Sequence, residues 1–148
     1  MSGPSGPLLV SFDASLRYAA DNATPTSAAV GYVVTDGLES LAERSVPVEA
    51  FVSSAALELR ALVEAARMVS EIAPTASSVH VSGDADAAVH VADPTHPATP
   101  SSDVARRRVE TIRSCFADIP VVTYRVVPRQ ANDRAHELAR AGHDRGRR

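Results

Sequence analysis

Residues 8–16, LLVSFDASL, decide the fold of this chain. The dense apolar run around Val10 and Phe12 predicts a strand buried on both faces, as at the centre of a sheet. The run ends at Asp13, and in α/β sheets ligands bind in the crevice beyond the carboxyl ends of central strands. A lone Asp there is more simply explained as a turn residue at the end of a strand. Whether Asp13 belongs to a site therefore depends on the other polar residues of the chain.

The composition favours one compact domain. The chain has 148 residues, of which 45% are hydrophobic, and this predicts a single domain over residues 8–142. We expect residues 1–7 to be a disordered leader and residues 143–148 a basic tail. The net charge is −3, so the molecule as a whole does not attract nucleic acid, and any nucleic-acid contact has to be local. All 15 basic residues are arginine, whose planar donors suit phosphate.

A single cysteine, Cys115, excludes an intramolecular disulfide and a cysteine-based zinc site. Its place in an apolar helical pattern predicts a small core residue. The first residues lack the features of a signal peptide, and no apolar run has the length of a membrane span. We therefore expect a cytoplasmic monomer that does not engage a membrane.

The first half of the chain predicts an antiparallel meander. After a polar loop at 17–26, residues 27–35 form a second strand, and Asp36-Gly37 is a hairpin turn signal. Residues 41–48 complete the three strands.

The second half alternates helices and strands. Apolar residues at helical spacing predict a long helix from Ser53 or Ser54, either of which can cap it, to a point before Pro74. Ser102 and Asn132 are expected to cap two later helices. The predicted elements are a helix at 53–72, a strand at 78–82, a helix at 84–91, a loop at 93–102, a helix at 103–117, a strand at 121–127 and a helix at 132–141. This order predicts an α/β fold in which a five-stranded mixed sheet, three antiparallel strands then two parallel ones, is flanked by helices.

Three acids fall at corresponding places in this order. If the first and fourth strands are parallel neighbours, Asp13 and Asp84 end at the same edge, and the long helix can bring Glu58 to the same point. Taken singly, Glu58 is explained as a solvated helix residue, and Asp84 is explained equally well as a helix cap or as a ligand. Taken together, such acids repel one another unless a cation lies among them. Oxygen ligands favour magnesium or manganese, and two such ions would support phosphodiester hydrolysis.

The chain resembles a type 1 ribonuclease H, of the short form without the basic protrusion, over nearly all of residues 8–142. Five segments carry the resemblance: VSFDAS, AAVGYVV, SSAALELRALVEAAR, VSGDADAAVHVA and VPRQANDRAHELARAG. It implies the RNase H-like fold and cleavage of the RNA strand of RNA–DNA hybrids. By this resemblance Asp13, Glu58 and Asp84 match the first three metal-binding acids, and Asn132 matches an Asn at the head of the last helix.

Some positions depart from the family pattern. His136 stands where the family has its fourth acid, an Asp. As a softer, neutral ligand it would favour manganese, or it is a bystander that faces the cleft. A Gly-Asn-Pro-Gly run after the first acid is missing, and Ser53 and Ser54 replace an Asn pair before the helix Glu. The candidate catalytic and metal-binding residues are Asp13, Glu58, Asp84 and His136, and the candidate substrate-binding residues are Ser15, Ser53, Ser54, Asn132 and Arg129.

Two further features have open interpretations. His143 either replaces the mobile loop histidine of some family members or belongs to the tail. An arginine patch on the penultimate helix, Arg106, Arg107 and Arg113, either contacts phosphates or is simply solvated.

The sequence thus predicts a two-metal endonuclease acting on RNA–DNA hybrids. The first alternative is a catalytically weakened module that binds hybrid or double-stranded RNA. The second is a nuclease of the same fold that acts on DNA.

Overall fold

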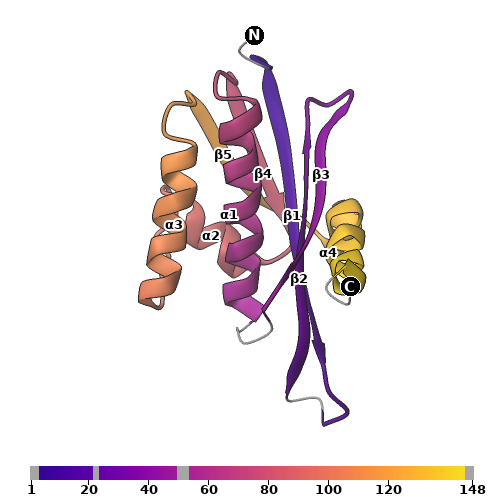
Figure 1. The fold of residues 1–148 in the computed structure, drawn as a ribbon. Helices are drawn as coiled ribbons and strands as arrows, with labels where there is room; N and C mark the ends of the chain where they lie inside the picture. The colour runs from indigo at the N-terminus through magenta and orange to yellow at the C-terminus, as the bar shows by residue number, and fades with distance from the viewer. Residues whose placement is uncertain (1–3, 22–23, 50–53, 146–148) are drawn as a thin grey trace.

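A five-stranded mixed sheet forms the centre of the molecule in the computed structural model, which describes residues 4–21, 24–49 and 54–145 (Figure 1). The strand order is β3-β2-β1-β4-β5. The strands are β1 (Pro7–Tyr18), β2 (Pro25–Thr35), β3 (Ser40–Val48), β4 (Ser78–Gly83) and β5 (Val121–Val126). β1, β2 and β3 pair antiparallel, whereas β4 runs parallel to both β1 and β5. The predicted fold class is confirmed.

Helices cover both faces of the sheet. α1 (Ser54–Ile72) and α3 (Asp103–Cys115) lie on one face, and α4 (Asp133–Arg145) lies on the other (Figure 1). A short helix, α2 (Asp86–Ala92), follows β4, and a 3₁₀ turn, η1 (Arg129–Asn132), leads into α4. No helix among the described residues is long and apolar enough to cross a membrane.

β1 is longer than the sequence pattern indicated. Asp13, predicted to end the strand, lies inside it, because the antiparallel pairing with β2 continues to Tyr18. The parallel pairing with β4 stops earlier, at Ser11 opposite Ser82. Asp13 therefore lies two residues beyond the point where β1 and β4 separate. The crevice expected beside Asp13 comes from this separation and not from the end of a strand.

Three other local predictions were wrong. α4 continues to Arg145, so His143 belongs to this helix and not to a tail. Ala85 is the N-cap of α2, so Asp84 lies before the helix and does not cap it. Asn132 does not cap α4, because its Oδ1 atom accepts no hydrogen bond from the described residues, while its Nδ2 atom donates to β1. The cap predicted at Ser102 is confirmed, since its hydroxyl accepts a hydrogen bond from the Ala105 N–H at 3.1 Å.

The two termini extend beyond the described residues. Of the predicted leader, residues 1–3 lie outside the described residues. Pro4–Gly6 are described, and Pro7 already belongs to β1. Residues 146–148 of the predicted tail also lie outside.

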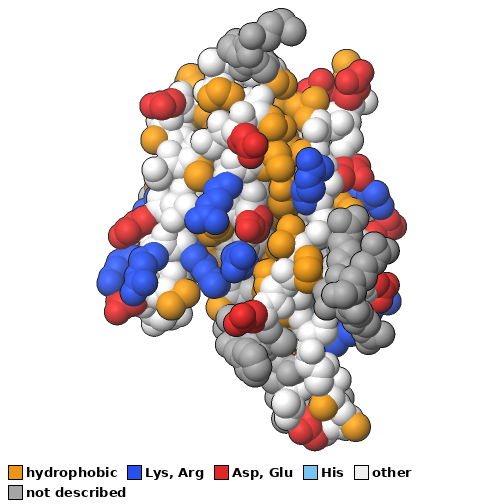
Figure 2. Space-filling view, viewed as in Figure 1, with side chains coloured by type: hydrophobic (Ala, Val, Ile, Leu, Met, Phe, Trp, Pro, Cys, Tyr) orange, Lys and Arg blue, Asp and Glu red, His pale blue; other side chains and the backbone are white. Residues whose placement is uncertain are grey.

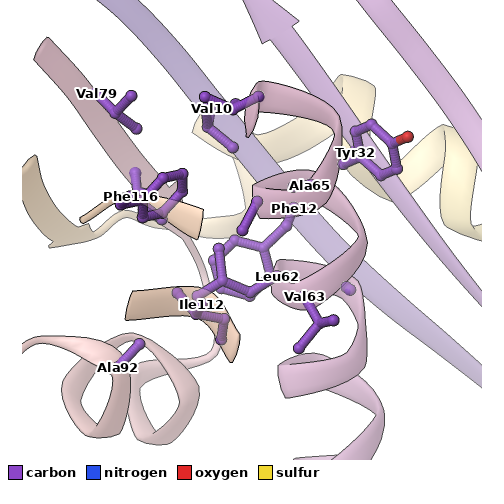
Figure 3. Close-up of a cluster of buried hydrophobic side chains, with 14 of the residues drawn as sticks. Val10, Phe12, Tyr32, Leu62, Val63, Ala65, Val79, Ala92, Ile112 and Phe116 are labelled. Carbon is purple, nitrogen blue, oxygen red and sulfur yellow. The ribbon is translucent and has the colours of Figure 1, made fainter. Parts of the chain in front are cut away.

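The main core lies between the sheet and the helices α1 and α3 (Figure 3). Phe12 from β1, Leu62 from α1 and Ile112 from α3 meet there and are at most 1% exposed. Burial of each such side chain contributes about 2 kcal/mol. Cys115 is free, half-buried and packed against this cluster, as the sequence indicated.

On the opposite face, α4 packs directly on the backbone of β2. A Cβ atom on Gly31 would lie 2.3 Å from the backbone nitrogen of Ala139 and 2.6 Å from the carbonyl oxygen of Ala135. No side chain fits at such distances, so glycine is required at this close approach. The contact brings the first turns of α4 over β1 and β2 at the level of Asp13.

Candidate active site

Three carboxylates converge where β1 and β4 separate. Asp13 comes from β1, Glu58 from the second turn of α1, and Asp84 directly follows β4. One carboxylate oxygen from each lies within 4.8 Å of the other two. The parallel pairing of β1 with β4 and the packing of α1 across them produce this cluster, as the order of the elements predicted.

Glu58 is not a solvated helix residue. Its Oε1 atom is buried and accepts no hydrogen bond from any described residue. Burial raises the pKa of Glu58 to about 9, and the negative charges of Asp13 and Asp84 add to the shift. In the absence of a cation, Glu58 therefore holds a proton at neutral pH.

Asp13 lies deepest of the three and is 1% exposed. Burial raises its pKa, and the charge of Asp84 acts in the same direction, whereas the hydrogen bond from His136 opposes the shift. The three carboxylates carry more negative charge than the neighbouring basic side chains balance. An unpartnered carboxylate oxygen and raised pKa values are what a site for a hard cation shows when no cation is present.

His136 contacts Asp13 and does not join the group of three ligands. Its Nδ1 atom lies 2.7 Å from the Asp13 Oδ2 atom. If the carboxylate is ionised it can only accept, so Nδ1 carries the hydrogen and Nε2 is left to accept. The Nη1 atom of Arg129 lies 3.1 Å from that Nε2 atom and 3.3 Å from Nδ1, so the guanidinium group is nearly equidistant from the two ring nitrogens. The imidazole thus connects a buried carboxylate to a guanidinium group.

Arg129 also contacts Asp84, another carboxylate of the cluster. Its Nε atom lies 3.4 Å from the Asp84 Oδ2 atom, while 62% of the Arg129 side chain remains exposed. A cleft of about 260 Å³ opens beside it, over Asp13 and Glu58. Ala14, Leu16, Tyr18 and Leu57 line the rest of the cleft. The sequence reading missed Leu16, Tyr18 and Leu57, because an apolar side chain beside an acid has no distinctive pattern.

Asn132 is buried and holds the strand that carries Asp13. It is 2% exposed, and its Nδ2 atom donates to the carbonyl oxygen of Phe12 at 2.9 Å. Its Oδ1 atom is buried without a hydrogen-bond partner among the described residues. In this arrangement the amide positions the backbone next to Asp13, which differs from the predicted contact with substrate.

Ser15 is bonded to the far end of α4. Its hydroxyl lies 2.8 Å from the Nε2 atom of His143, and the hydroxyl of Ser27 lies 2.6 Å from the Nδ1 atom. His143 is 1% exposed, so it is neither a mobile histidine nor a tail residue. The sequence offered one signal for this role: His136 and His143 are seven residues apart and share a helix face. The role of Ser27 had no such signal.

The remaining candidates are distributed differently. Ser53 lies outside the described residues, and Ser54 begins α1. Arg106 pairs with Asp103 at 2.6 Å. Arg113 donates to the carbonyl oxygens of the last residues of α2, so it is not available to a ligand in this arrangement.

Comparison with solved structures finds close matches to this fold. The RNase H1 of the archaeon Halobacterium salinarum superposes with a TM-score of 0.78 at 22% identity, covering 94% of this chain and 98% of that chain. The N-terminal RNase H domain of rv2228c from Mycobacterium tuberculosis, solved as a fusion with maltose binding protein, gives 0.78 at 19% identity and covers 93% of this chain and 94% of that chain. LC11-RNase H1, from compost, in complex with an RNA/DNA hybrid also gives a TM-score of 0.78 at 19% identity, and the match covers 95% of this chain and 99% of that chain.

No protein-family model matches the sequence, and no curated protein matches it. The likeness is thus one of structure. The chain has the ribonuclease H-like fold, with three carboxylates gathered at the point where the first and fourth strands separate.

Proposed function

We propose that this protein is a metal-dependent endonuclease that hydrolyses the RNA strand of RNA–DNA hybrids. The observation that carries the proposal is the convergence of Asp13, Glu58 and Asp84, within 4.8 Å, on an RNase H-like fold. The complex of LC11-RNase H1 with an RNA/DNA hybrid supports the choice of substrate. A cytoplasmic setting and a monomeric state stay predictions from composition.

The donor set fits a hard divalent cation. Three carboxylates without thiolates suit Mg²⁺ or Mn²⁺, and the unpartnered Oε1 atom of Glu58 needs such a partner. Asp13, Glu58 and Asp84 would hold the metal, and we propose two ions. When bound, the metal activates a water molecule and stabilises the charge that develops on the phosphodiester.

The other residues orient these ligands. Asn132 fixes the carbonyl group of Phe12 and with it the course of β1 into Asp13. His136 donates to Asp13 and fixes the rotation of that carboxylate. Only its Nε2 atom is left to bind a cation, and that atom contacts Arg129 in this structure. We therefore assign His136 primarily to positioning Asp13, and we propose metal binding through Nε2 as its second role.

The exposed guanidinium of Arg129 lies at the rim of the cleft, where it can meet a substrate phosphate. Recognition of RNA would depend on the 2′-hydroxyl groups across the wide minor groove and not on base sequence.

One observation favours the alternative of a binding module that cleaves poorly. Arg129 lies beside Asp84 and His136 lies beside Asp13, so two of the three carboxylates already have a basic neighbour. Such neighbours weaken the attraction for a cation. The module would then hold a hybrid or double-stranded RNA without rapid hydrolysis.

A strand-specific cleavage assay tests these possibilities. Hybrids labelled on either the RNA or the DNA strand are incubated with Mg²⁺, Mn²⁺ or EDTA. We expect cleavage of the RNA strand alone, with metal only. Binding without cleavage in either metal would favour the module, and cleavage of a labelled DNA duplex would favour a DNA nuclease.

A further inference from the structure

A second basic feature lies outside the carboxylate site, in a pocket of about 360 Å³ between α1 and α3. Its charged lining consists of four arginines: Arg60 and Arg67 from α1, and Arg107 and Arg108 from α3. Val63, Val104 and Thr111 complete it. Figure 2 shows the Arg side chains, in blue, gathered over α1 and α3. We refer to this feature as the arginine pocket.

The positive charge of the arginine pocket is poorly compensated. Among the described residues, the ion pairs include none for Arg67, Arg107 or Arg108. Arg60 lies 3.6 Å from the Glu64 carboxylate, but its Nε atom is buried without a hydrogen-bond partner. Arg108 donates to the backbone carbonyl of Ala56, so its charge meets no carboxylate there.

The guanidinium groups also repel each other. Burial lowers the pKa of Arg108, and the positive charge of Arg60 lowers it further. Like charges held together at the mouth of a pocket are stabilised by an anion with several acceptor oxygens. The planar donors of arginine match phosphate in particular. The half-exposed Val104 supplies an apolar wall of the pocket.

The arginine pocket begins at the level of the carboxylate site along α1 but on another side of the helix, because residues two positions apart, such as Glu58 and Arg60, project in nearly opposite directions. Arg60 follows Glu58 by two residues, and Arg108 bonds to Ala56, two residues before Glu58. Two residues span about 3 Å along a helix axis. The pocket thus flanks the same end of α1 that supplies Glu58, on the side of the helix that faces α3.

We propose that the arginine pocket binds backbone phosphates of a nucleic-acid strand whose scissile bond lies at the carboxylate cluster. The pocket extends the footprint of the substrate over α1 and α3, and it adds affinity that does not depend on sequence or on metal. This inference rests on the proposed function for the identity of the strand.

The test is the salt dependence of binding, measured in EDTA so that cleavage plays no part. The double variant Arg67→Gln/Arg107→Gln removes two exposed guanidinium groups from the pocket. Arg140→Gln, an exposed residue of α4 on the other face of the sheet, is the matched control. Fluorescence anisotropy reports the affinity for a labelled hybrid at several salt concentrations. Thermal unfolding confirms that the variants fold.

For the double variant we expect affinity at low salt to fall about 5- to 20-fold and the slope of log K against log salt to decrease by about 1.5. Arg140→Gln should change neither by more than about twofold. In the metal-supported reaction the double variant should raise KM and leave kcat unchanged. Wild-type affinity and slope in the double variant would overturn the inference. Titration with inorganic pyrophosphate gives a second contrary outcome. If pyrophosphate binds in the pocket while the double substitution leaves the affinity for the hybrid unchanged, the pocket is assigned to a small phosphate and the inference is overturned.

The two proposals fail in different ways. If the wild type cuts hybrids but the double variant binds like the wild type, the arginine pocket is not part of the substrate footprint and the proposed function stands. If the wild type binds a hybrid or another duplex through Arg67 and Arg107 but cuts nothing in Mg²⁺ or Mn²⁺, the pocket stands and the proposed function fails.

Discussion

Gly31 lies directly opposite Asp13 in the antiparallel pairing of β1 with β2, and the backbone of α4 occupies the space where a side chain of residue 31 would be. The absence of a Cβ atom at this one position allows α4 to approach the sheet. That approach brings His136 within 2.7 Å of Asp13. Packing and site geometry are therefore coupled at this glycine.

We expect Gly31→Ala to destabilise the protein by about 2–4 kcal/mol, because the added Cβ atom meets helix backbone and not a flexible side chain. Urea unfolding measures the change. Gly6→Ala is the control, since a Cβ atom there has no neighbour within 4 Å, and it should leave stability unchanged. Equal stability of the two variants would show that α4 can shift away without cost.

We expect Asp13→Asn and Asp84→Asn to abolish metal-dependent cleavage while the protein stays folded. Each change removes a cation ligand at nearly constant volume. In EDTA, Asp13→Asn should unfold at least as late as the wild type, because it removes a buried charge that is repelled by Asp84. Thermal unfolding and the cleavage of labelled hybrid check both statements. Full activity of either variant would remove these carboxylates from the proposed mechanism.

The raised pKa of Glu58 predicts an unusual pH dependence of stability in the absence of metal. Its pKa is about 9 in the folded protein and about 4.5 when unfolded, so between these values the folded state binds the extra proton. Stability must then fall as the pH rises through this window. From pH 5.5 to 8.5 in EDTA, we expect the free energy of unfolding of the wild type to drop by about 4 kcal/mol relative to Glu58→Gln. Urea unfolding at three pH values measures the difference.

Divalent metal should reverse this trend, because the cation competes with the proton for Glu58. With Mn²⁺ present the wild type should gain stability toward pH 8.5, and Glu58→Gln should gain less. Parallel pH profiles for the two proteins in EDTA would show that Glu58 is ionised in the fold, contrary to its burial.

The residues of the carboxylate site were easier to predict from the sequence than the local backbone geometry around them. The order of strands and helices placed Asp13, Glu58 and Asp84 together, because parallel pairing and helix packing follow from apolar periodicity. The pattern did not show that Asp13 lies within a longer strand, since apolar alternation carries no information on where the pairing with β4 stops. Asn132 is of a residue type that commonly caps helices, but its Nδ2 atom donates to the buried carbonyl oxygen of Phe12, and its Oδ1 atom accepts no hydrogen bond from the described residues.

Most contacts of α4 could not be predicted from local pattern. His143 is polar and near the chain end, which is typical of a tail, yet it lies between two serines of β1 and β2. The small residues Gly31 and Gly142 decide this packing, because they let the helix and the sheet approach closely. Such complementarity exists only between segments distant in sequence.

His136 provides the sharpest test of the site, because it stands beside Asp13 without joining the three carboxylates. We expect His136→Asp to raise activity in Mg²⁺ relative to Mn²⁺, since a carboxylate adds negative charge and a harder ligand. The same change should lower stability in EDTA, because a fourth acid next to buried Asp13 is repelled. His136→Asn is the matched control: it can still donate to Asp13 but adds no charge, so it should not favour Mg²⁺. The ratio of initial rates in the two metals, measured for the three proteins, decides the question. The same ratio in His136→Asp as in the wild type would exclude His136 as a ligand. If His136→Asp loses activity in both metals and His136→Asn does not, donation to Asp13 is the essential role of His136.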